Sequence, residues 1–174
     1  MLGFNSYQIL KKKYNVFGTC RNNYETNDEK LFVFEHNIEN IINIIEKNKP
    51  NIILNCIAQL RENNYTDKNN MIFSNCTIPI SIANYCKLNN IYFIHFSTDA
   101  IFKSSNNYHT INQTYSPESF YGLTKSISET ISNNSLVLRI CPIGFDKFKR
   151  NSLFNFIYDN KNKEINEYKN VFFN

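Results

Sequence analysis

The chain has 174 residues, of which 42% are hydrophobic and 20% charged, so it is long enough for one domain and too apolar for an unfolded tail. Its 19 basic and 15 acidic residues leave a net charge of +4 without a basic stripe, which gives no support to nucleic-acid binding. No run of about 18 apolar residues occurs, so the sequence predicts no membrane span.

Segments of strand and helix character alternate along the chain. In chain order, we expect a helix at 4–12, a strand at 15–19, a helix at 39–47, a strand at 51–56, a helix at 68–88, a strand at 91–96, a helix at 120–132, a strand at 135–140 and a helix at 152–158, with 168–173 opening another element. This order predicts an α/β fold with a doubly wound parallel sheet and helices on both faces. Such sheets bind ligands beyond the carboxyl ends of their strands.

The five cysteines are odd in number and include no C-x-x-C pair. Neither they nor the three histidines have the spacing of a metal site, so we expect no bound metal. Reduced thiols are typical of a cytoplasmic protein, which is the location that we expect. His95 lies inside an apolar strand, where we expect it to be part of the core.

The chemistry-bearing residues concentrate between 95 and 125. Polar side chains follow the strand at 91–96, at the sheet edge where ligands are expected: Ser97, Thr98 and Asp99. Tyr121 and Lys125 are four residues apart on a predicted helix and therefore share a face. A neighbouring ammonium favours the phenolate of a tyrosine, which brings its pKa closer to the range useful for acid–base catalysis.

A second tyrosine and lysine have the same spacing, Tyr7 and Lys11. Nothing around this pair supplies a substrate site, so we expect it to lie on an exposed helix face. The spacing allows Glu129, four residues beyond Lys125, to pair with that lysine on the helix face, and we expect Glu129 to have a structural rather than a catalytic role.

Six segments together resemble the extended short-chain dehydrogenase/reductases, and most closely the dTDP-4-dehydrorhamnose reductase-like sugar-nucleotide reductases. They are Y-N-V-F-G-T-C-R (14–21), P-N-I-I-L-N-C-I-A (50–58), N-C-T-I-P-I-S-I-A (75–83), F-I-H-F-S-T-D-A-I-F (93–102), Y-G-L-T-K-S-I-S-E (121–129) and L-R-I-C-P-I-G (138–144). They follow the order of that family over almost the whole chain.

The resemblance implies NAD(P)H-dependent reduction of a 4-keto group on a nucleotide-linked deoxysugar, in rhamnose or surface-polysaccharide precursor synthesis. It implies that Tyr121 protonates the developing alkoxide and that Lys125 binds the nicotinamide ribose and lowers the tyrosine pKa. Thr98 would orient the carbonyl, and Asp99 would lie beside the sugar. The other cofactor-binding residues that it implies are Gly3, Arg21, Asn55, Cys56, Ile57, Ala58, Ser97, Pro142 and Ile143. For residues 55–58 an ordinary buried turn is the alternative.

Arg21 follows the second-strand candidate of the family pattern. An acidic residue there would bind the ribose 2′-hydroxyl of NAD, whereas an arginine suits a 2′-phosphate. We therefore expect NADP(H) rather than NAD(H), with a solvated surface role for Arg21 as the alternative.

The family pattern also predicts what this chain lacks. Its first strand and the first two glycines of the phosphate-binding fingerprint have no counterpart, and Gly3 matches the third. We expect an incomplete Rossmann-like domain over 1–150 and the start of a substrate-binding region over 151–174, with most of that second domain absent.

Three functions remain open at this point. The first is the reductase, and the second is a nucleotide-sugar epimerase or dehydratase with the same tyrosine and lysine. The third is a regulatory module that binds a nucleotide without turnover. A nucleotide sugar is the expected partner in the enzymatic cases, and a homodimer is left open.

Overall fold

The computed structural model describes residues 2–21, 28–60, 65–105, 108–129, 134–142, 144 and 152–164. Its elements are α1 (Leu2–Leu10), β1 (Gly18–Cys20), β2 (Leu31–Val33), α2 (Ile38–Asn48), β3 (Ile52–Asn55), α3 (Tyr65–Ile72), the π-helix η1 (Phe73–Thr77), α4 (Ile78–Leu88), β4 (Tyr92–Ser97), the 3-10 helix η2 (Asp99–Ile101), α5 (Phe120–Ser128), β5 (Ser135–Arg139) and α6 (Leu153–Asp159). The element predicted at 168–173 and the predicted domain boundary near 150 fall outside the described residues.

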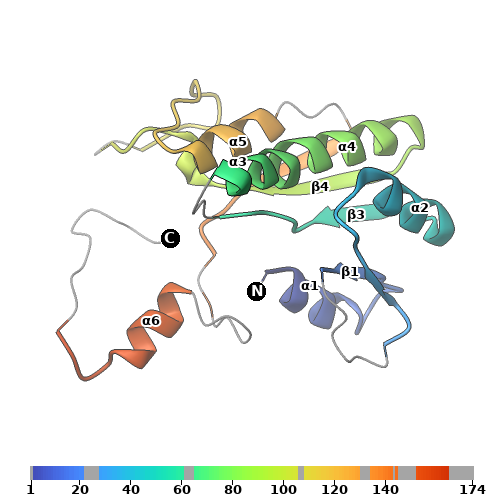
Figure 1. Ribbon diagram of the computed structural model, residues 1–174, viewed down its shortest axis with the longest axis horizontal. Helices are drawn as coiled ribbons and strands as arrows, with labels where there is room; N and C mark the ends of the chain where they lie inside the picture. The colour runs from blue at the N-terminus through green and yellow to red at the C-terminus, as the bar shows by residue number, and fades with distance from the viewer. Residues whose placement is uncertain are drawn as a thin grey trace.

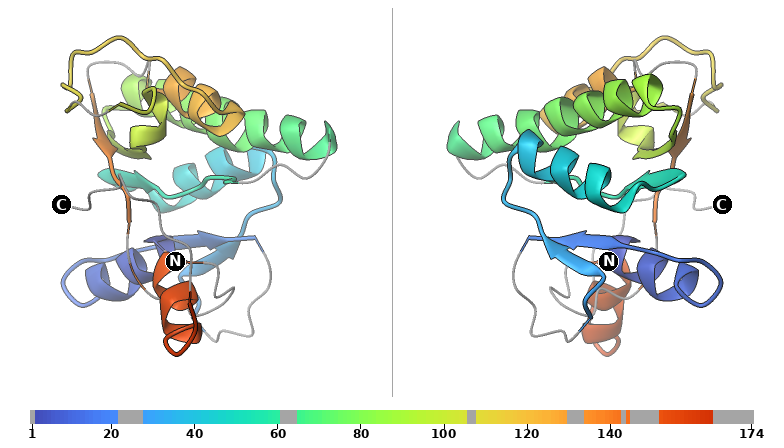
Figure 2. Two further views of the ribbon diagram at one scale, coloured as in Figure 1. Left: turned by 90° about the vertical axis from the view of Figure 1, so that its left-hand side faces the viewer. Right: turned by 90° about the vertical axis from the view of Figure 1, so that its right-hand side faces the viewer.

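All the described strands pair in parallel, which confirms the predicted α/β class. Strand β4 is the centre of a three-stranded sheet with β3 and β5, and β1 pairs with β2 in a separate sheet. Figures 1 and 2 show α3, α4 and α5 on one side of the larger sheet, with α1 and the β1–β2 pair on its other side. Strand β2 was not predicted, because its three residues are too few to show a pattern.

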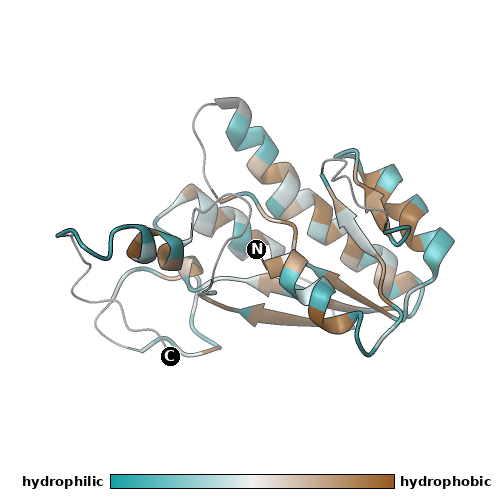
Figure 3. Ribbon diagram, turned by 90° about the horizontal axis from the view of Figure 1, so that it is seen from below, coloured by the Kyte–Doolittle hydropathy of each residue, from teal (hydrophilic) through white to brown (hydrophobic). Residues whose placement is uncertain are grey.

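The hydrophobic core lies where α2 and α4 meet the sheet. In α2, Ile41 and Ile45 are buried one turn apart, and the Asn37 side chain caps the helix by accepting from the Asn40 N–H at 2.7 Å. Figure 3 shows the strands coloured as hydrophobic and the helices with mixed faces. The buried cluster consists of Phe34, Ile41, Ile45, Ile78, Ile82, Ala83, Cys86, Ile91 and Phe93.

The helix predicted at 68–88 is present, but a π-helical turn interrupts it. Residues 73–77 separate α3 from α4, which has a proline in its first turn. Ser74 and Asn75 in this turn are fully buried although they are polar. Single π-turns inside helices are frequent at functional sites, and this one faces the candidate site described below.

The prediction for the second tyrosine–lysine pair is correct for Lys11, which is exposed, and wrong for Tyr7. Tyr7 is buried, and its hydroxyl donates to the Asp28 carboxylate at 2.7 Å. Burial and this carboxylate raise the pKa of Tyr7 to about 12. Lys11 pairs with the same carboxylate at 3.5 Å, so the three side chains tie α1 to the residues before β2.

Within the described residues, none of the helices has the length and hydropathy that a membrane crossing requires.

The first prediction concerns the core. Phe93 on β4 is completely buried, so we expect Phe93→Ala to lower the free energy of unfolding by about 3–5 kcal/mol through lost contacts and a cavity. Leu136→Ala on the adjoining strand is the control, because Leu136 remains 41% exposed and should cost clearly less. Urea denaturation of both variants measures the difference, and equal losses would contradict this placement of the core.

Candidate active site

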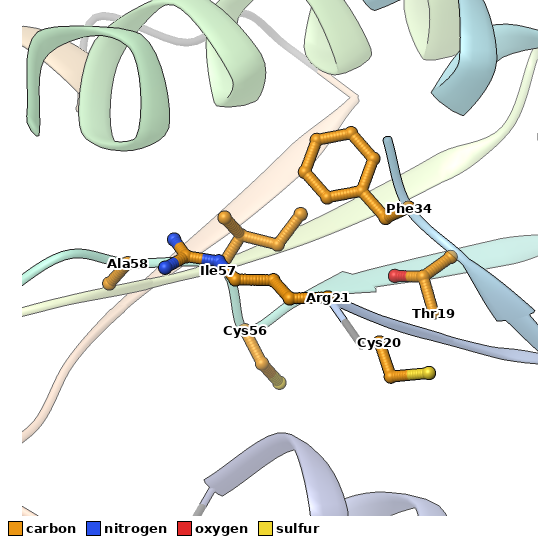
Figure 4. Close-up of a pocket in the computed structure, with 7 residues that line it drawn as sticks. All are labelled: Thr19, Cys20, Arg21, Phe34, Cys56, Ile57 and Ala58. Carbon is orange, nitrogen blue, oxygen red and sulfur yellow. The ribbon is translucent and has the colours of Figure 1, made fainter. Parts of the chain in front are cut away.

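A pocket lies at the carboxyl ends of β1 and β3 (Figure 4). The residues that line it are Thr19, Cys20, Arg21, Phe34, Cys56, Ile57 and Ala58. Four residues expected to bind cofactor therefore lie together, although they come from two separate sheets: Arg21, Cys56, Ile57 and Ala58. In Figure 4 the Arg21 side chain reaches across the pocket toward the segment that carries Ile57 and Ala58.

The start of α1 adjoins this pocket. A Cβ on Gly3 would lie 3.2 Å from Cβ of Cys56, which is tighter than an ordinary contact. The missing side chain therefore allows the helix to approach the turn after β3. A helix N-terminus at this place is suited to bind an anion such as a pyrophosphate, because its first N–H groups have no partner within the helix.

Polar groups also gather beside Arg21. Its Nη2 lies 3.5 Å from Ser74 Oγ, and Nε2 of His36 lies 3.1 Å from the same hydroxyl. Burial and the charge of Arg21 both lower the pKa of His36. Arg21 itself is exposed, so its guanidinium is accessible to a ligand in the pocket.

The carboxyl end of β4 carries a second polar group of residues. Ser97 and Thr98 are buried, whereas Asp99 is exposed. Thr98 caps η2, because its hydroxyl accepts from the Ala100 N–H at 3.2 Å and donates to the Asp99 carboxylate at 3.0 Å. The hydroxyl of Thr98 is thereby held in one orientation.

Helix α5 brings Tyr121 to this threonine. Ser119 caps the helix by accepting from the Gly122 N–H at 3.0 Å. A Cβ on Gly122 would collide with the Ala100 carbonyl oxygen, so glycine is required for α5 to pack so closely on η2. The resulting approach brings the side chain of Tyr121 next to that of Thr98.

The pKa of Tyr121 lies above its usual value, not below it as the sequence suggested. Burial is the main cause, and the nearby Asp99 and Cys141 act in the same direction. A hydrogen bond donated by Thr98 would act in the opposite direction, but it does not reverse the shift. Tyr121 is therefore protonated at neutral pH.

Lys125 lies on the same helix one turn later and is almost completely buried. Its Nζ donates to the Phe96 carbonyl oxygen at 2.6 Å and lies 3.1 Å from Nε2 of His95. Burial lowers the pKa of Lys125 to about 8, although the charge of Glu129 acts in the opposite direction. His95 is in the core as predicted, but its contact with Lys125 could not be seen from a strand pattern.

Two buried asparagines join the strand ends to α5. Asn55 accepts from the Ile57 N–H at 3.1 Å and contacts His95, so it supports the pocket rather than lining it. Asn75 accepts from the Gln59 N–H and donates to the Gln59 carbonyl, both at 2.9 Å, and donates to the Thr124 hydroxyl at 3.0 Å. Sequence reasoning missed Asn75, and the available signal was a polar S-N pair inside an apolar helical run.

The sequence matches the family model described as the RmlD substrate binding domain over residues 2–166. The chain belongs to this family. No curated protein sequence matches it significantly.

Solved structures share the fold of this RmlD-type chain. A hypothetical dTDP-4-dehydrorhamnose reductase from Sulfolobus tokodaii is similar over 94% of this chain and 60% of its own, with 21% identity and a TM-score of 0.80. The Bacillus anthracis dTDP-4-dehydrorhamnose reductase in complex with NADP has 17% identity and a TM-score of 0.65 over 87% of this chain and 54% of its own. The dTDP-glucose 4,6-dehydratase of that organism, in complex with NAD, has 14% identity and a TM-score of 0.72 over 92% of this chain and 58% of its own. This chain therefore spans about three-fifths of their length or less.

Glu129 of the RmlD-type chain pairs with Arg139 rather than with Lys125, the partner that the helical spacing allowed, and this pair fits the structural role expected of it. Arg139 donates from Nη2 at 2.8 Å and from Nε at 3.1 and 3.2 Å to the two oxygens of the Glu129 carboxylate, which is 2% exposed. The guanidinium also donates to the Ile111 carbonyl oxygen at 3.1 Å, and its central carbon lies 5.2 Å from the Phe102 ring. The loop between η2 and α5 is thereby tied to the end of β5.

The remaining predicted site residues follow β5. Pro142 is exposed, and Ile143 lies outside the described residues. Within the part of the chain that the structure describes, no three His, Cys, Asp or Glu side chains form a group that could hold a metal ion.

The Glu129–Arg139 pair generates the second prediction. Burial alone would raise the pKa of Glu129, but hydrogen bonds, above all from Arg139, lower it below its usual 4.5. A lowered pKa adds stability at pH values above 4.5, and this contribution is lost as the pH falls through the pKa of the folded state. We expect Glu129→Gln to cost about 1–3 kcal/mol at neutral pH, because the guanidinium loses its carboxylate, and to flatten the loss of stability in acid.

Chemical denaturation between neutral and acid pH measures this effect. Glu35→Gln is the control, since Glu35 is exposed, and it should retain the acid slope of the unaltered protein. An unchanged slope in Glu129→Gln would show that this carboxylate does not contribute to acid sensitivity.

Proposed function

We propose that this protein reduces a 4-keto group on a nucleotide-linked deoxysugar with NAD(P)H, as a dTDP-4-dehydrorhamnose reductase-like enzyme. The observation that carries the proposal is the juxtaposition of Tyr121 and Thr98 at the carboxyl end of β4. Membership of the RmlD family supports it, and so does the pocket at the ends of β1 and β3. The role in rhamnose or surface-polysaccharide precursor synthesis is part of the same proposal.

The pocket residues fit a dinucleotide. The start of α1 at Gly3 and the turn at Cys56, Ile57 and Ala58 would hold the pyrophosphate and the ribose beside it, while Arg21 would reach the adenosine end. The bound cofactor would supply a hydride. Lys125, near the carboxyl end of β4, would donate hydrogen bonds to the nicotinamide ribose.

The proton would come from Tyr121. Its raised pKa keeps the hydroxyl protonated at neutral pH, so it can donate that proton to the carbonyl oxygen as the oxygen becomes an alkoxide. Thr98 would hold the same oxygen by turning its hydroxyl proton from the Asp99 carboxylate, to which it donates in this structure, toward the ligand. The exposed carboxylate of Asp99 would accept a hydrogen bond from a sugar hydroxyl.

The third prediction tests the proton donor. Tyr121→Phe removes the proton donor, so we expect NADPH consumption with a dTDP-linked 4-keto-6-deoxyhexose to fall by about 100- to 10,000-fold. Absorbance of NADPH measures the rate. Tyr7→Phe is the matched control, because Tyr7 and Lys11 repeat the spacing of Tyr121 and Lys125 in a structural pair, and it should retain the rate.

The same assay separates the competing functions. An epimerase or dehydratase regenerates its nicotinamide cofactor, and the fold likeness to a dTDP-glucose 4,6-dehydratase makes that the second candidate. Conversion of the sugar without net NADPH consumption would favour it. Binding of NADPH without any conversion would favour a regulatory module.

We also propose that NADP(H) is preferred over NAD(H). The pocket position of the exposed Arg21 supports this, and similar structures hold either cofactor, NADP in one reductase and NAD in a dehydratase. A guanidinium suits the 2′-phosphate through charge-assisted hydrogen bonds.

The fourth prediction follows from this preference. Hydrogen bonds to a charged group contribute about 1.5–3 kcal/mol, so Arg21→Ala should weaken NADPH binding by about 10- to 100-fold and leave NADH binding nearly unchanged. Isothermal titration calorimetry with both nucleotides measures the two affinities. Lys87→Ala removes an exposed cation from α4 outside the pocket and should change neither. Equal weakening of both nucleotides by Arg21→Ala would contradict a role at the 2′-position.

A further inference from the structure

Behind the candidate catalytic residues, a buried chain of hydrogen bonds runs from Lys125 to the turn after β3. His95, Asn55, Lys125 and Ser128 are each at most 3% exposed. Water does not compete at these atoms, so each polar atom depends on its protein partners. The direction of each bond can therefore be followed from one residue to the next.

Asn55 sets the orientation of the first link. Its Oδ1 accepts from the Ile57 N–H at 3.1 Å, which only an oxygen can do. Its amide nitrogen therefore faces Nδ1 of His95 at 3.0 Å and donates to it. A ring nitrogen that accepts has no proton, so neutral His95 must have its proton on Nε2. Burial and the charge of Lys125 lower the pKa of His95 to about 3, which makes the ring neutral.

The proton on Nε2 of His95 has two neighbours. Ser128 Oγ lies at 3.0 Å and donates its own proton to the Lys125 carbonyl oxygen at 2.7 Å, so it is free to accept. Nζ of Lys125 lies at 3.1 Å. An ammonium has no lone pair, so the ammonium and the Nε2–H of His95 would be two donors facing each other. A neutral amine has a lone pair and can accept a hydrogen bond from that N–H.

Charged and titratable groups on the other elements act on the same amine. Glu129 at the end of α5 favours the ammonium, and a thiolate at Cys76 on η1 would do the same. Burial raises the pKa of the Cys76 thiol, which donates to the Thr124 carbonyl oxygen and so remains neutral. The Phe96 carbonyl oxygen accepts from Nζ in either charge state. Among the described residues, His95 is thus the contact of Nζ that disfavours the ammonium form of Lys125.

We propose that His95, held in its Nε2–H form by Asn55, is a positioning residue that fixes the amine of Lys125 and destabilises its ammonium form. The inference rests on the proposed function, in which Lys125 is the cofactor-binding lysine. It extends that function by naming the residue that controls the position and the charge of this lysine. A lysine near its titration midpoint can gain or lose a proton at neutral pH at little free-energy cost. A lysine with an ordinary pKa stays charged at that pH. Because Asn55 also holds Ile57 in the cofactor pocket, the lysine is coupled to the turn that would hold the nucleotide.

The fifth prediction is the titration of Lys125 by nuclear magnetic resonance. In lysine-labelled protein, with the signal assigned through Lys125→Met, the midpoint should lie at about 8 instead of the ordinary 10.5. His95→Gln can turn an amide oxygen toward Nζ, so the midpoint should rise toward the ordinary value. Asn55→Asp should also raise it, because a carboxylate accepts from Nδ1–H and leaves Nε2 as an acceptor for the ammonium.

Ser126→Ala is the matched control, because Ser126 neighbours Lys125 in sequence but bonds within its own helix, to the Leu123 carbonyl oxygen. Its midpoint should equal that of the unaltered protein. An ordinary midpoint in the unaltered protein would overturn the proposal, and so would a folded His95→Gln variant with an unchanged midpoint, since burial alone would then set the charge.

A measurement on the unaltered protein keeps the test decisive if the variants fail to fold. The nitrogen chemical shifts of His95 report which ring atom has the proton, and we expect a neutral ring protonated on Nε2 across the neutral range. A proton on Nδ1 would overturn the inference. Neither measurement needs a substrate, so a protein without reductase activity would refute the proposed function while leaving this result to stand or fall by itself.

Discussion

The parallel pairing of β4 with β3 and β5 is the constraint on which the site depends. In this register Asn55 lies opposite His95, and Ser97 lies opposite Arg139. Parallel strands end at the same edge of their sheet, so the polar residues at these ends converge although they are far apart in the sequence. Burial of Phe93 in the core holds β4 in place and thereby holds Thr98 beyond its end.

Buried polar side chains then determine how α5 lies on this edge. Asn75 bonds both the Gln59 backbone and Thr124, while Lys125 bonds the Phe96 carbonyl oxygen. A buried polar group without a partner costs about 1–3 kcal/mol, so a shift of α5 along the sheet would break several of these bonds at once. The position of Tyr121 beside Thr98 is therefore set by polar contacts that surround it rather than by the pair itself.

Patterns in the sequence predicted much of the fold. The strands found at Ile52–Asn55, Tyr92–Ser97 and Ser135–Arg139 agree with the predicted segments within a residue or two, because continuous apolar runs of this length are typical of buried parallel strands. The predicted helix over 39–47 is also confirmed, as its isoleucines recur at helical spacing. The separate pairing of β1 with β2 was not predicted, because spacing along the chain does not specify which strands pair.

The candidate site was predictable in its residue types and less so in its contacts. Thr98 and Tyr121 lie together as the motif order indicated, and Arg21 lies in one pocket with residues 56–58. The ion-pair partners of individual charged residues could not be predicted from the sequence. Glu129 has Lys125 one turn away on its own helix, but it binds Arg139 from β5. Ion pairs depend on distances in space, and helical spacing limits them only within one helix.

The sequence by itself determined the alternation of strands and helices, the family pattern and the chemical groups available at the strand ends. These depend on local periodicity and on residue type, which the chain contains without reference to its fold. Only the tertiary structure decided the charge environment of Tyr121 and Lys125. Burial is the main cause of both pKa shifts, and it arises when distant segments pack together and exclude water.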